Sequence, residues 1–331
     1  MKKFINEPMN FVKESLEGIV LAHSDQVKFA KEDRNGILRA DAPVAGKVAI
    51  ATGGGAGHLP VFLGYVGKGL ADGASVGNVF TSPSADAMVN VAKEIHSGNG
   101  VLFLYGNYFG DKMNFDLAAE MLEDDEDIRV ETVRVSDDVA SAPREDWTKR
   151  RGVAGIFFAY KIAGACAEKL LPLEKVKAVA EKAVENIATM GVAISSCTIP
   201  SSGKPTFEIG EDEMEVGMGI HGEPGIRRAK LTTANEIVNE LVPYLLEDLQ
   251  IKAGDNIAIL VNGSGTTPLE ELYIVNREVH HLLAEKNINI YKTYVGEYAT
   301  SLDMGGFSLS FLKLDNELKE YLDAPAESPF I

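Results

Sequence analysis

Cysteine is scarce in this sequence, with two residues among 331, Cys166 and Cys197. Each lies in an apolar stretch and neither belongs to a CxxC pair, which argues against a disulfide framework and predicts reduced core thiols in a cytoplasmic protein. No spacing of His, Cys and acidic residues matches a metal site. We therefore expect no metal and no resident cofactor.

Basic clusters are equally scarce, and the only one is Lys149-Arg150-Arg151. The chain has 49 acidic against 32 basic residues, which gives a formal net charge of -17 and a pI near 4.8. A surface that binds nucleic acid needs clustered Lys and Arg. The sequence thus argues against direct nucleic-acid binding, and the basic triplet reads as a solvated helix start.

Long hydrophobic runs are missing as well. The longest, such as residues 153–167, are broken by Gly, Lys or Cys well short of the ~18 residues that a membrane-spanning helix needs. Residues 1–8 turn polar after two apolar positions, which predicts no secretory signal. We expect no membrane association.

With 45% hydrophobic residues, the chain can still build a large core. Strand-like apolar runs alternate with amphipathic segments of helical length, which is the pattern of α/β proteins. In the first half, the expected strands are 47–52, 101–105 and 129–135, and the expected helices are 84–95 and 111–123. Residues 150–190 have an almost wholly helical pattern, broken only near Pro172.

A second round of the same alternation follows. Its expected strands are 191–199, 213–220, 256–261, 288–293 and 307–314, and its expected helices are 233–246 and 269–285. The simplest interpretation is an α/β fold of two α/β domains with mostly parallel sheets, residues 1–185 and 186–331.

Two polar glycine loops follow expected strands in the first domain. Gly53, Gly54 and Gly55 precede His58, and glycines let backbone N–H groups approach a ligand closely. The segment is neither a Walker A loop nor a GxGxxG motif, and a plain tight turn is the alternative. The second loop, Gly106 to Asp111, would meet the first at the carboxyl edge of a parallel sheet. Asp111 could equally cap the following helix.

His221 stands in a glycine-framed segment, Gly217-Met218-Gly219-Ile220-His221-Gly222-Glu223-Pro224-Gly225. Such a histidine is sterically open, and its neutral ring is nucleophilic near pH 7. It could add to a ketone if the alkoxide is stabilised. Two further glycine loops, 262–268 and 300–306, are either site loops of the second domain or ordinary turns.

Taken in order, several segments resemble the K subunit of dihydroxyacetone kinase, the DhaK family. They are ADAPVAGKV (40–48), GGGAGH (53–58), FTSP (80–83), NYFGD (107–111), CTIP (197–200), GKP (203–205), GIHGEPG (219–225) and TSLDM (300–304). The resemblance extends from end to end of the chain.

The resemblance implies a homodimer of two α/β domains that binds dihydroxyacetone. It implies that His221 forms a covalent hemiaminal with the ketone, that His58 and Asp111 hold the hydroxyls and assist proton movement, and that the backbone of Gly55 contacts the ligand. In the mechanism we expect, His58 donates to the developing oxyanion and Asp111 takes up the displaced proton. The nucleotide or phosphorylated carrier belongs to a separate L subunit.

Three departures from the family pattern surround the expected pocket. Gly106 replaces a lysine, Leu59 replaces the glutamate of Gly-His-Glu-Pro, and residues 261–265 replace Val-Asn-Asn-Leu-Gly. The family includes a non-kinase coactivator, DhaQ, that associates with a TetR-like regulator. The sequence therefore predicts a ketose-sensing coactivator with a TetR-like partner, and the alternative is a K subunit for dihydroxyacetone or a related ketose such as erythrulose.

Overall fold

Six strands of the first half form one mixed sheet. The computed structural model describes residues 2–331. The strands are β1 (Val27–Phe29), β2 (Gly36–Arg39), β3 (Ala49–Ala56), β4 (Gly73–Val79), β5 (Val101–Gly106) and β6 (Val130–Val135), in the order β1-β2-β4-β3-β5-β6. The four strands β4, β3, β5 and β6 run parallel, whereas β1 and β2 pair antiparallel at one edge. The helices of this half are α1 (Phe11–Ala22), α2 (Ala85–Ile95) and α3 (Phe109–Glu126).

The second sheet has the order β11-β10-β12-β7-β8-β9. Its strands are β7 (Ile187–Ser195), β8 (Glu213–Val216), β9 (Arg227–Lys230), β10 (Asn256–Gly263), β11 (Asn289–Gly296) and β12 (Gly305–Leu314). The α/β class is confirmed, but only β10 and β11 pair parallel here. The connections between the paired strands β7 and β8 and between β8 and β9 contain no helix, and parallel neighbours need a long crossover. The expectation of mostly parallel strands thus describes the first sheet and not the second.

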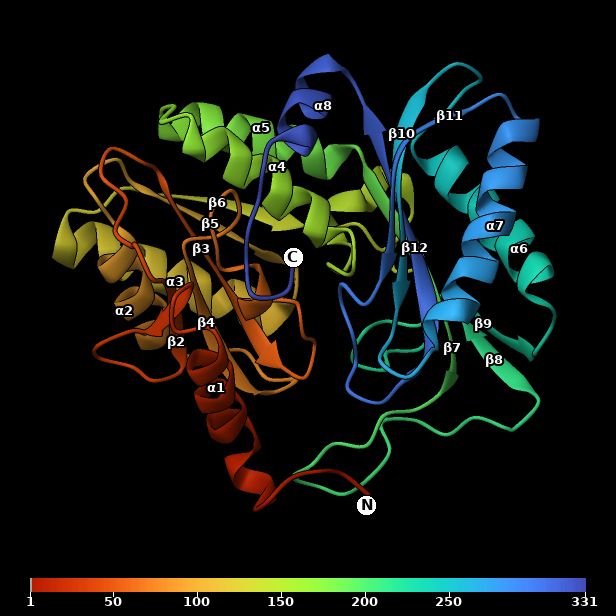
Figure 1. The fold of residues 1–331 in the computed structure, drawn as a ribbon, viewed down its shortest axis with the longest axis horizontal. Coiled ribbons are helices and arrows are strands. Elements are labelled where there is room, and N and C mark those ends of the chain that lie inside the picture. Colours follow the sequence, from red (N-terminus) through yellow and green to blue (C-terminus); the bar gives the residue numbers. More distant parts are fainter. Residues whose placement is uncertain (1) are drawn as a thin grey trace.

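Helices separate and cover the two sheets (Figure 1). The remaining helices are α4 (Ile156–Glu168), α5 (Leu173–Glu185), α6 (Ala234–Asp248), α7 (Leu269–Glu285) and α8 (Asn316–Asp323). The α4–α5 pair packs between the sheets in one core that contains residues of both, such as Leu102 and Leu260. The alternate residues Phe103 and Ile259 enter separate cores, against α2 and α3 and against α6 and α7. Strands buried on both faces explain the near-continuous apolar runs in the sequence.

Most expected helices are confirmed, and two carry the caps that their sequences indicate. Ser84 accepts a hydrogen bond from the backbone N–H of Ala87 at the start of α2, and Thr233 forms a capping box with Glu236 at the start of α6. Cys166 and Cys197 are both buried and free, as expected. None of the helices in residues 2–331 is both long and apolar enough to cross a bilayer.

The helical interpretation of residues 150–190 is wrong at both ends. Helix α4 begins only at Ile156, and residues 187–190 belong to β7, so this strand spans 187–195 rather than 191–199. The first four residues of β7 pair antiparallel with β12, where Thr189 lies opposite Ser310. This partner is more than a hundred residues away, and a pairing of such range overrides the local helical pattern.

The expected boundary at residue 185 lies between α5 and β7. The first sheet lies before it and the second after it, as the red-to-yellow and green-to-blue halves of Figure 1 show. The C-terminal residues, however, return to the first half, where Ser328 Oγ donates to the carbonyl of Gly64 at 2.7 Å. The division into domains therefore stays a prediction.

Candidate active site

The three glycines lie inside β3 rather than after it. A Cβ on Gly54 would lie 2.0 Å from the ring of Phe62, and a Cβ on Gly55 would lie 2.6 Å from the backbone nitrogen of Thr81. On Gly53 it would lie 2.7 Å from the carbonyl oxygen of Ser75. The missing side chains therefore let an aromatic ring and neighbouring backbone pack directly on the strand. This close packing positions the segment that carries His58.

His58 is fully buried, and its tautomer is fixed by a carbonyl. Its Nδ1 lies 2.7 Å from the oxygen of Thr300, and a carbonyl oxygen only accepts, so Nδ1 carries the proton. Burial lowers the pKa of His58 to about 3, and the nearby His221 lowers it further in the same direction. The ring is therefore neutral at pH 7, and Nε2 presents a lone pair.

His221 lies beside His58 although the two are far apart in sequence. Their ring centroids are 4.7 Å apart and the rings meet edge to face, at 84°. The ring of Phe80 stacks on His58 at 4.7 Å, and the rings of Phe80 and Tyr108 meet His221 edge-on. The two histidines thus share one aromatic enclosure.

Glu223 orients the His221 ring. Its Oε1 lies 2.9 Å from His221 Nδ1, and its Oε2 accepts the backbone N–H of His221 at 2.9 Å. Burial by itself would raise the pKa of Glu223, but these bonds outweigh it and lower the pKa to about 2. A carboxylate accepts only, so Nδ1 carries the ring proton and Nε2 is free to act as the nucleophile.

Asp111 lies in the first turn of α3, and it does not cap the helix. The N-cap position belongs to Tyr108, which leaves the Asp111 carboxyl available to the site. Burial raises the pKa of Asp111 to about 6, although a hydrogen bond from Ser82 and the proximity of His221 oppose the rise. An aspartate with such a pKa can both give and take a proton near pH 7.

Three buried polar atoms around His221 have no hydrogen-bond partner among residues 2–331: His58 Nε2, Asp111 Oδ1 and the Tyr108 hydroxyl oxygen. A buried polar group left unpaired costs about 1–3 kcal/mol. Such groups need an explanation when they cluster. A small ligand with hydroxyl groups would satisfy them beside a nucleophilic nitrogen.

Gly106, the last residue of β5, adjoins this cluster. A Cβ built there would lie 3.5 Å from the carbonyl oxygen of Gly152 and 3.5 Å from the ring of Tyr108, which is ordinary van der Waals contact. The position therefore accepts a side chain without displacing the backbone. The absence of a cation at Gly106 is a property of the sequence and is not imposed by the fold.

The two glycine loops of the second half, 262–268 and 300–306, hold the His58 ring in position. Asn262 Nδ2 donates to the carbonyl of Ala299, and Asn262 Oδ1 accepts the backbone N–H groups of Tyr298 and Ala299, all at 2.8 Å. Thr300 follows directly, and its carbonyl oxygen accepts the hydrogen bond from His58 Nδ1–H. These loops hold a site residue in place. Their role is therefore intermediate between the two that the sequence left open, site loops of the second domain and ordinary turns.

The interpretation of the basic triplet 149–151 as a solvated helix start is wrong. The triplet lies at the end of a 3-10 helix, Arg144–Lys149, and the side chains of Arg150 and Arg151 are 2% and 15% exposed and paired with carboxylates.

Sequence reasoning did not single out Glu223, Phe80, Tyr108 or Asp138. Arg151 binds Asp138 at 2.7 Å and approaches Glu223 Oε2 at 4.0 Å. Burial raises the pKa of Asp138 to about 7 despite the opposing Arg151 charge. Only Glu223 carries a local signal, because a carboxylate two residues after a glycine-framed histidine can turn back onto its ring.

Known proteins are similar to this chain in sequence and in fold. A family model described as the Dak1 domain matches residues 17–330. The dihydroxyacetone-binding subunit DhaK of the PTS-dependent dihydroxyacetone kinase 2 of Listeria innocua is 48% identical over 330 residues, which cover 100% of this chain and 99% of that protein. The corresponding PEP-dependent DhaK subunit of Escherichia coli is 38% identical, over 99% of this chain and 98% of that protein.

Two solved structures match over nearly the whole chain. The dihydroxyacetone kinase of C. freundii superimposes with a TM-score of 0.90 at 31% identity, and the match covers 99% of this chain and 60% of the C. freundii chain. The dihydroxyacetone kinase operon co-activator Dha-DhaQ superimposes with a TM-score of 0.88 at 33% identity, over 97% of both chains. The chain therefore belongs to the Dak1 domain family, which it shares with the DhaK subunits.

Proposed function

We propose that this chain is a dihydroxyacetone-binding protein that traps the ketose as a covalent hemiaminal on His221. The observation that carries the proposal is the pair of unpartnered buried atoms, His58 Nε2 and Asp111 Oδ1, beside the free Nε2 of His221. Dihydroxyacetone has one ketone and two hydroxyl groups. Its carbonyl carbon suits the nucleophile, and its hydroxyls can donate to the two unpartnered acceptors.

The covalent step balances with groups of this chain and proton exchange with solvent. His221 Nε2 forms a bond to the ketone carbon, and the carbonyl π pair moves to the oxygen. The imidazolium so formed keeps its Nδ1–H on the Glu223 carboxylate, whose low pKa keeps it charged. Protonated Asp111, about one-tenth of the population at pH 7 for a pKa of about 6, gives its proton to the alkoxide. Loss of the Nδ1 proton to solvent makes the imidazole neutral, a proton from solvent restores the Asp111 carboxyl, and the reverse sequence releases the ketose.

The role of His58 in this mechanism differs from the one that the sequence indicated. Its Nδ1 proton is directed to Thr300 and its pKa is about 3, so Nε2 has no proton to donate to an oxyanion. His58 therefore accepts a hydrogen bond from a ketose hydroxyl and positions it. The proton for the alkoxide comes from Asp111, whereas from the sequence we expect Asp111 to take up the displaced proton.

We further propose that this chain is a ligand-sensing coactivator, for which the trapped ketose is the signal. It would work with a TetR-like regulator of the dihydroxyacetone kinase operon. Gly106 supports this proposal, because the position beside the trap carries no cation although it has room for one. A phosphoryl-transfer site must stabilise moving negative charge. A sensor needs only reversible capture and a surface that reports it.

The second candidate is the K subunit of a kinase, and one observation favours it. The DhaK subunit from Listeria innocua is 48% identical, whereas the DhaQ co-activator is 33% identical. In this reading, a separate L subunit supplies the phosphoryl group and the missing cation. An L-erythrulose kinase of Pectobacterium atrosepticum, 43% identical over 99% of this chain and 56% of that protein, extends the candidate substrates to four-carbon ketoses.

Helix α3 offers a surface for either partner. Its side chains Phe109, Met113 and Leu117 are 80%, 56% and 49% exposed and repeat every four residues, so they form one apolar stripe. The stripe begins two residues before Asp111, at the site itself. Exposed Asp116 and Glu120 lie on the same helix, so the complementary partner segment would be apolar with basic flanks.

The expected homodimer has a separate candidate surface in the second half. Ile194, Leu231, Leu269 and Ile274 are each at least 39% exposed, and Ile194, Leu231 and Ile274 line one shallow apolar hollow. We expect Ile274→Glu to convert a dimer into a monomer in sedimentation velocity runs. An unchanged sedimentation coefficient would place the dimer contact elsewhere.

One experiment separates the two candidates. The purified chain is mixed with a cognate L subunit, ATP or the phosphorylated carrier, and dihydroxyacetone, and ketose phosphate is measured. Turnover of about one per second or more lies in the ordinary enzyme range and would rule out the coactivator proposal. Its absence, together with ketose-dependent association with a TetR-like protein, would rule out the kinase subunit. Gly106→Lys is the matched variant, because it restores the cation without backbone strain.

A further inference from the structure

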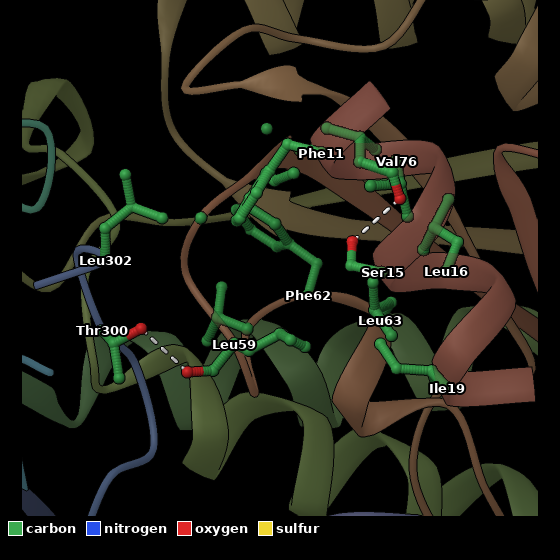
Figure 2. A pocket seen from close by; sticks show the side chains of 16 residues that line it. Phe11, Ser15, Leu16, Ile19, Leu59, Phe62, Leu63, Val76, Thr300 and Leu302 are labelled. Carbon is green, nitrogen blue, oxygen red and sulfur yellow. Dashed lines mark hydrogen bonds between the residues drawn. The ribbon is translucent and has the colours of Figure 1, made fainter. Parts of the chain in front are cut away.

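A cavity of about 200 Å³ is lined by Gly57 and Leu59, the two neighbours of His58 in the chain. Helix α1 closes one side with Leu16 and Ile19, and Val76 of β4 and Phe62 also line the cavity (Figure 2). The opposite side is formed by the segments 57–59 and 300–302. Figure 2 shows Leu59, Thr300 and Leu302 facing α1 across this space. None of His58, Asp111 and His221 lines this cavity, so it is distinct from the ketose trap, but Gly54 and Gly55 of β3 line it and form part of a wall shared with that site.

The side-chain hydroxyls at the cavity are already used. Ser15 Oγ donates to the carbonyl of Val12 at 2.8 Å, and Thr300 Oγ1 donates to the carbonyl of Leu59 at 2.9 Å. The other lining side chains are hydrocarbon. A buried water needs two to four polar partners, and an apolar cavity of about 150 Å³ stays dry and binds benzene. A cavity of this size and lining therefore selects a small apolar molecule.

The shared wall connects the cavity to the ketose trap. Thr300 contacts His58 twice, because its N–H donates to the His58 carbonyl at 3.2 Å and its own carbonyl accepts from His58 Nδ1 at 2.7 Å. The N–H of Leu302 donates to the carbonyl of Gly57 at 2.8 Å. A displacement of Thr300 would therefore be passed to the His58 ring through the hydrogen bond at Nδ1, and Leu59 is linked to Thr300 by the bond from Oγ1.

We propose that this cavity is a binding site for a small uncharged apolar molecule, an aromatic ring or a short aliphatic chain of roughly six to eight carbons by comparison with the benzene-sized cavity above. Its occupancy changes the affinity of the His221 trap through Leu59 and Thr300. The binding part stands alone, whereas the coupling part rests on the proposed ketose function.

Benzene is the test molecule, and methyl NMR is the assay. In the full chain with labelled Leu, Ile and Val methyl groups, benzene should produce saturable shifts at Leu16, Ile19 and Val76. Ser15→Leu fills the cavity from a half-buried helix position and should reduce the apparent benzene affinity at least tenfold. Lys13→Leu makes the same new side chain on the exposed face of α1 and should bind benzene like the unmodified chain.

Coupling is measured with dihydroxyacetone carrying ¹³C at the ketone carbon, whose resonance moves when the carbon becomes tetrahedral. Saturating benzene should shift the apparent ketose dissociation constant at least twofold, and Ser15→Leu should remove the effect. Absent or unsaturable methyl shifts, or equal shifts in Ser15→Leu, would overturn the site. Normal benzene binding with an unchanged ketose constant would overturn the coupling. Normal benzene binding with no tetrahedral signal at all would refute the ketose trap and with it the coupling, but leave the cavity site intact.

Discussion

Replacing Asp111 by Asn should stabilise the fold while it impairs the ketose trap. Burial raises the Asp111 pKa from 3.8 to about 6, and one pKa unit corresponds to about 1.36 kcal/mol. The unfolded chain therefore releases this proton more easily than the folded one. Between pH 3.8 and pH 6 the charged carboxylate progressively destabilises the native state, reaching about 3 kcal/mol above that range. At pH 4 the same arithmetic gives under about 1 kcal/mol.

Asn is uncharged at every pH, so Asp111→Asn should raise the free energy of unfolding by about 1–3 kcal/mol at pH 7 and by less than about 1 kcal/mol at pH 4. The lower limit allows for the lost charge-assisted bond from Ser82. Guanidinium unfolding followed by circular dichroism at both pH values gives the two numbers. The matched control is Asp116→Asn on the exposed face of the same helix, which should change neither.

Formation of the ketose adduct should be impaired in Asp111→Asn, although the fold becomes more stable. Without a proton source for the alkoxide, Asp111→Asn should form the tetrahedral ¹³C adduct at least about 100-fold more slowly, in keeping with the usual contribution of general acid catalysis. A destabilised Asp111→Asn at pH 7, or a stability gain independent of pH, would refute the assignment of a desolvated carboxyl. An unchanged adduct rate would refute its role as the proton source.

Three other changes probe the same site, and a fourth probes the exposed surface of α3. His221→Ala should abolish the tetrahedral ¹³C adduct while the circular dichroism spectrum stays unchanged, and an adduct that persists would mean that the nucleophile is another group. Glu223→Gln should weaken ketose affinity about 10- to 100-fold, as expected for loss of a charged hydrogen bond, and an unaltered affinity would contradict its orienting role. Because the His58 pKa is lowered to about 3, stability should fall as the pH drops from about 6.5 toward 3, whereas His58→Asn should flatten this acid limb and weaken ketose binding without moving the attachment site. Met113→Glu should abolish partner association in pull-down assays but leave the adduct signal intact, and loss of both would mean that the helix itself is disturbed.

Local elements of this fold are readable from the sequence. The helix predicted over 84–95 is found at Ala85–Ile95, and the helix predicted over 269–285 is found at Leu269–Glu285. The apolar spacing of both helices and the Ser84 cap of the first are short-range properties. The stretch 187–190 was misassigned because its strand exists only through pairing with β12. Strand β4, which separates β2 from β3, was missed for a related reason, since its small residues Gly73, Ala74 and Ser75 carry little strand signal.

The candidate site divides in the same way. The glycine-framed His221 and the loops with His58 and Asp111 could be selected from residue type and spacing. The orientation of His221 by Glu223 was within reach of such reasoning, because the two residues are neighbours in sequence. The tautomer of His58 was not, because its partner Thr300 lies 242 residues away.

The α/β class, the positions of most helices and the three candidate site residues can be predicted from the sequence, since each depends on apolar period, capping and local composition. The antiparallel pairing of most of the second sheet and the approach of His58 and Asp111 to His221 appear only in the folded chain. The tertiary structure also decided the protonation of two of these residues, with a pKa of about 3 for His58 and about 6 for Asp111. The reason is desolvation, because the loss of water around an ionisable group depends on which distant segments cover it, and no local pattern records that.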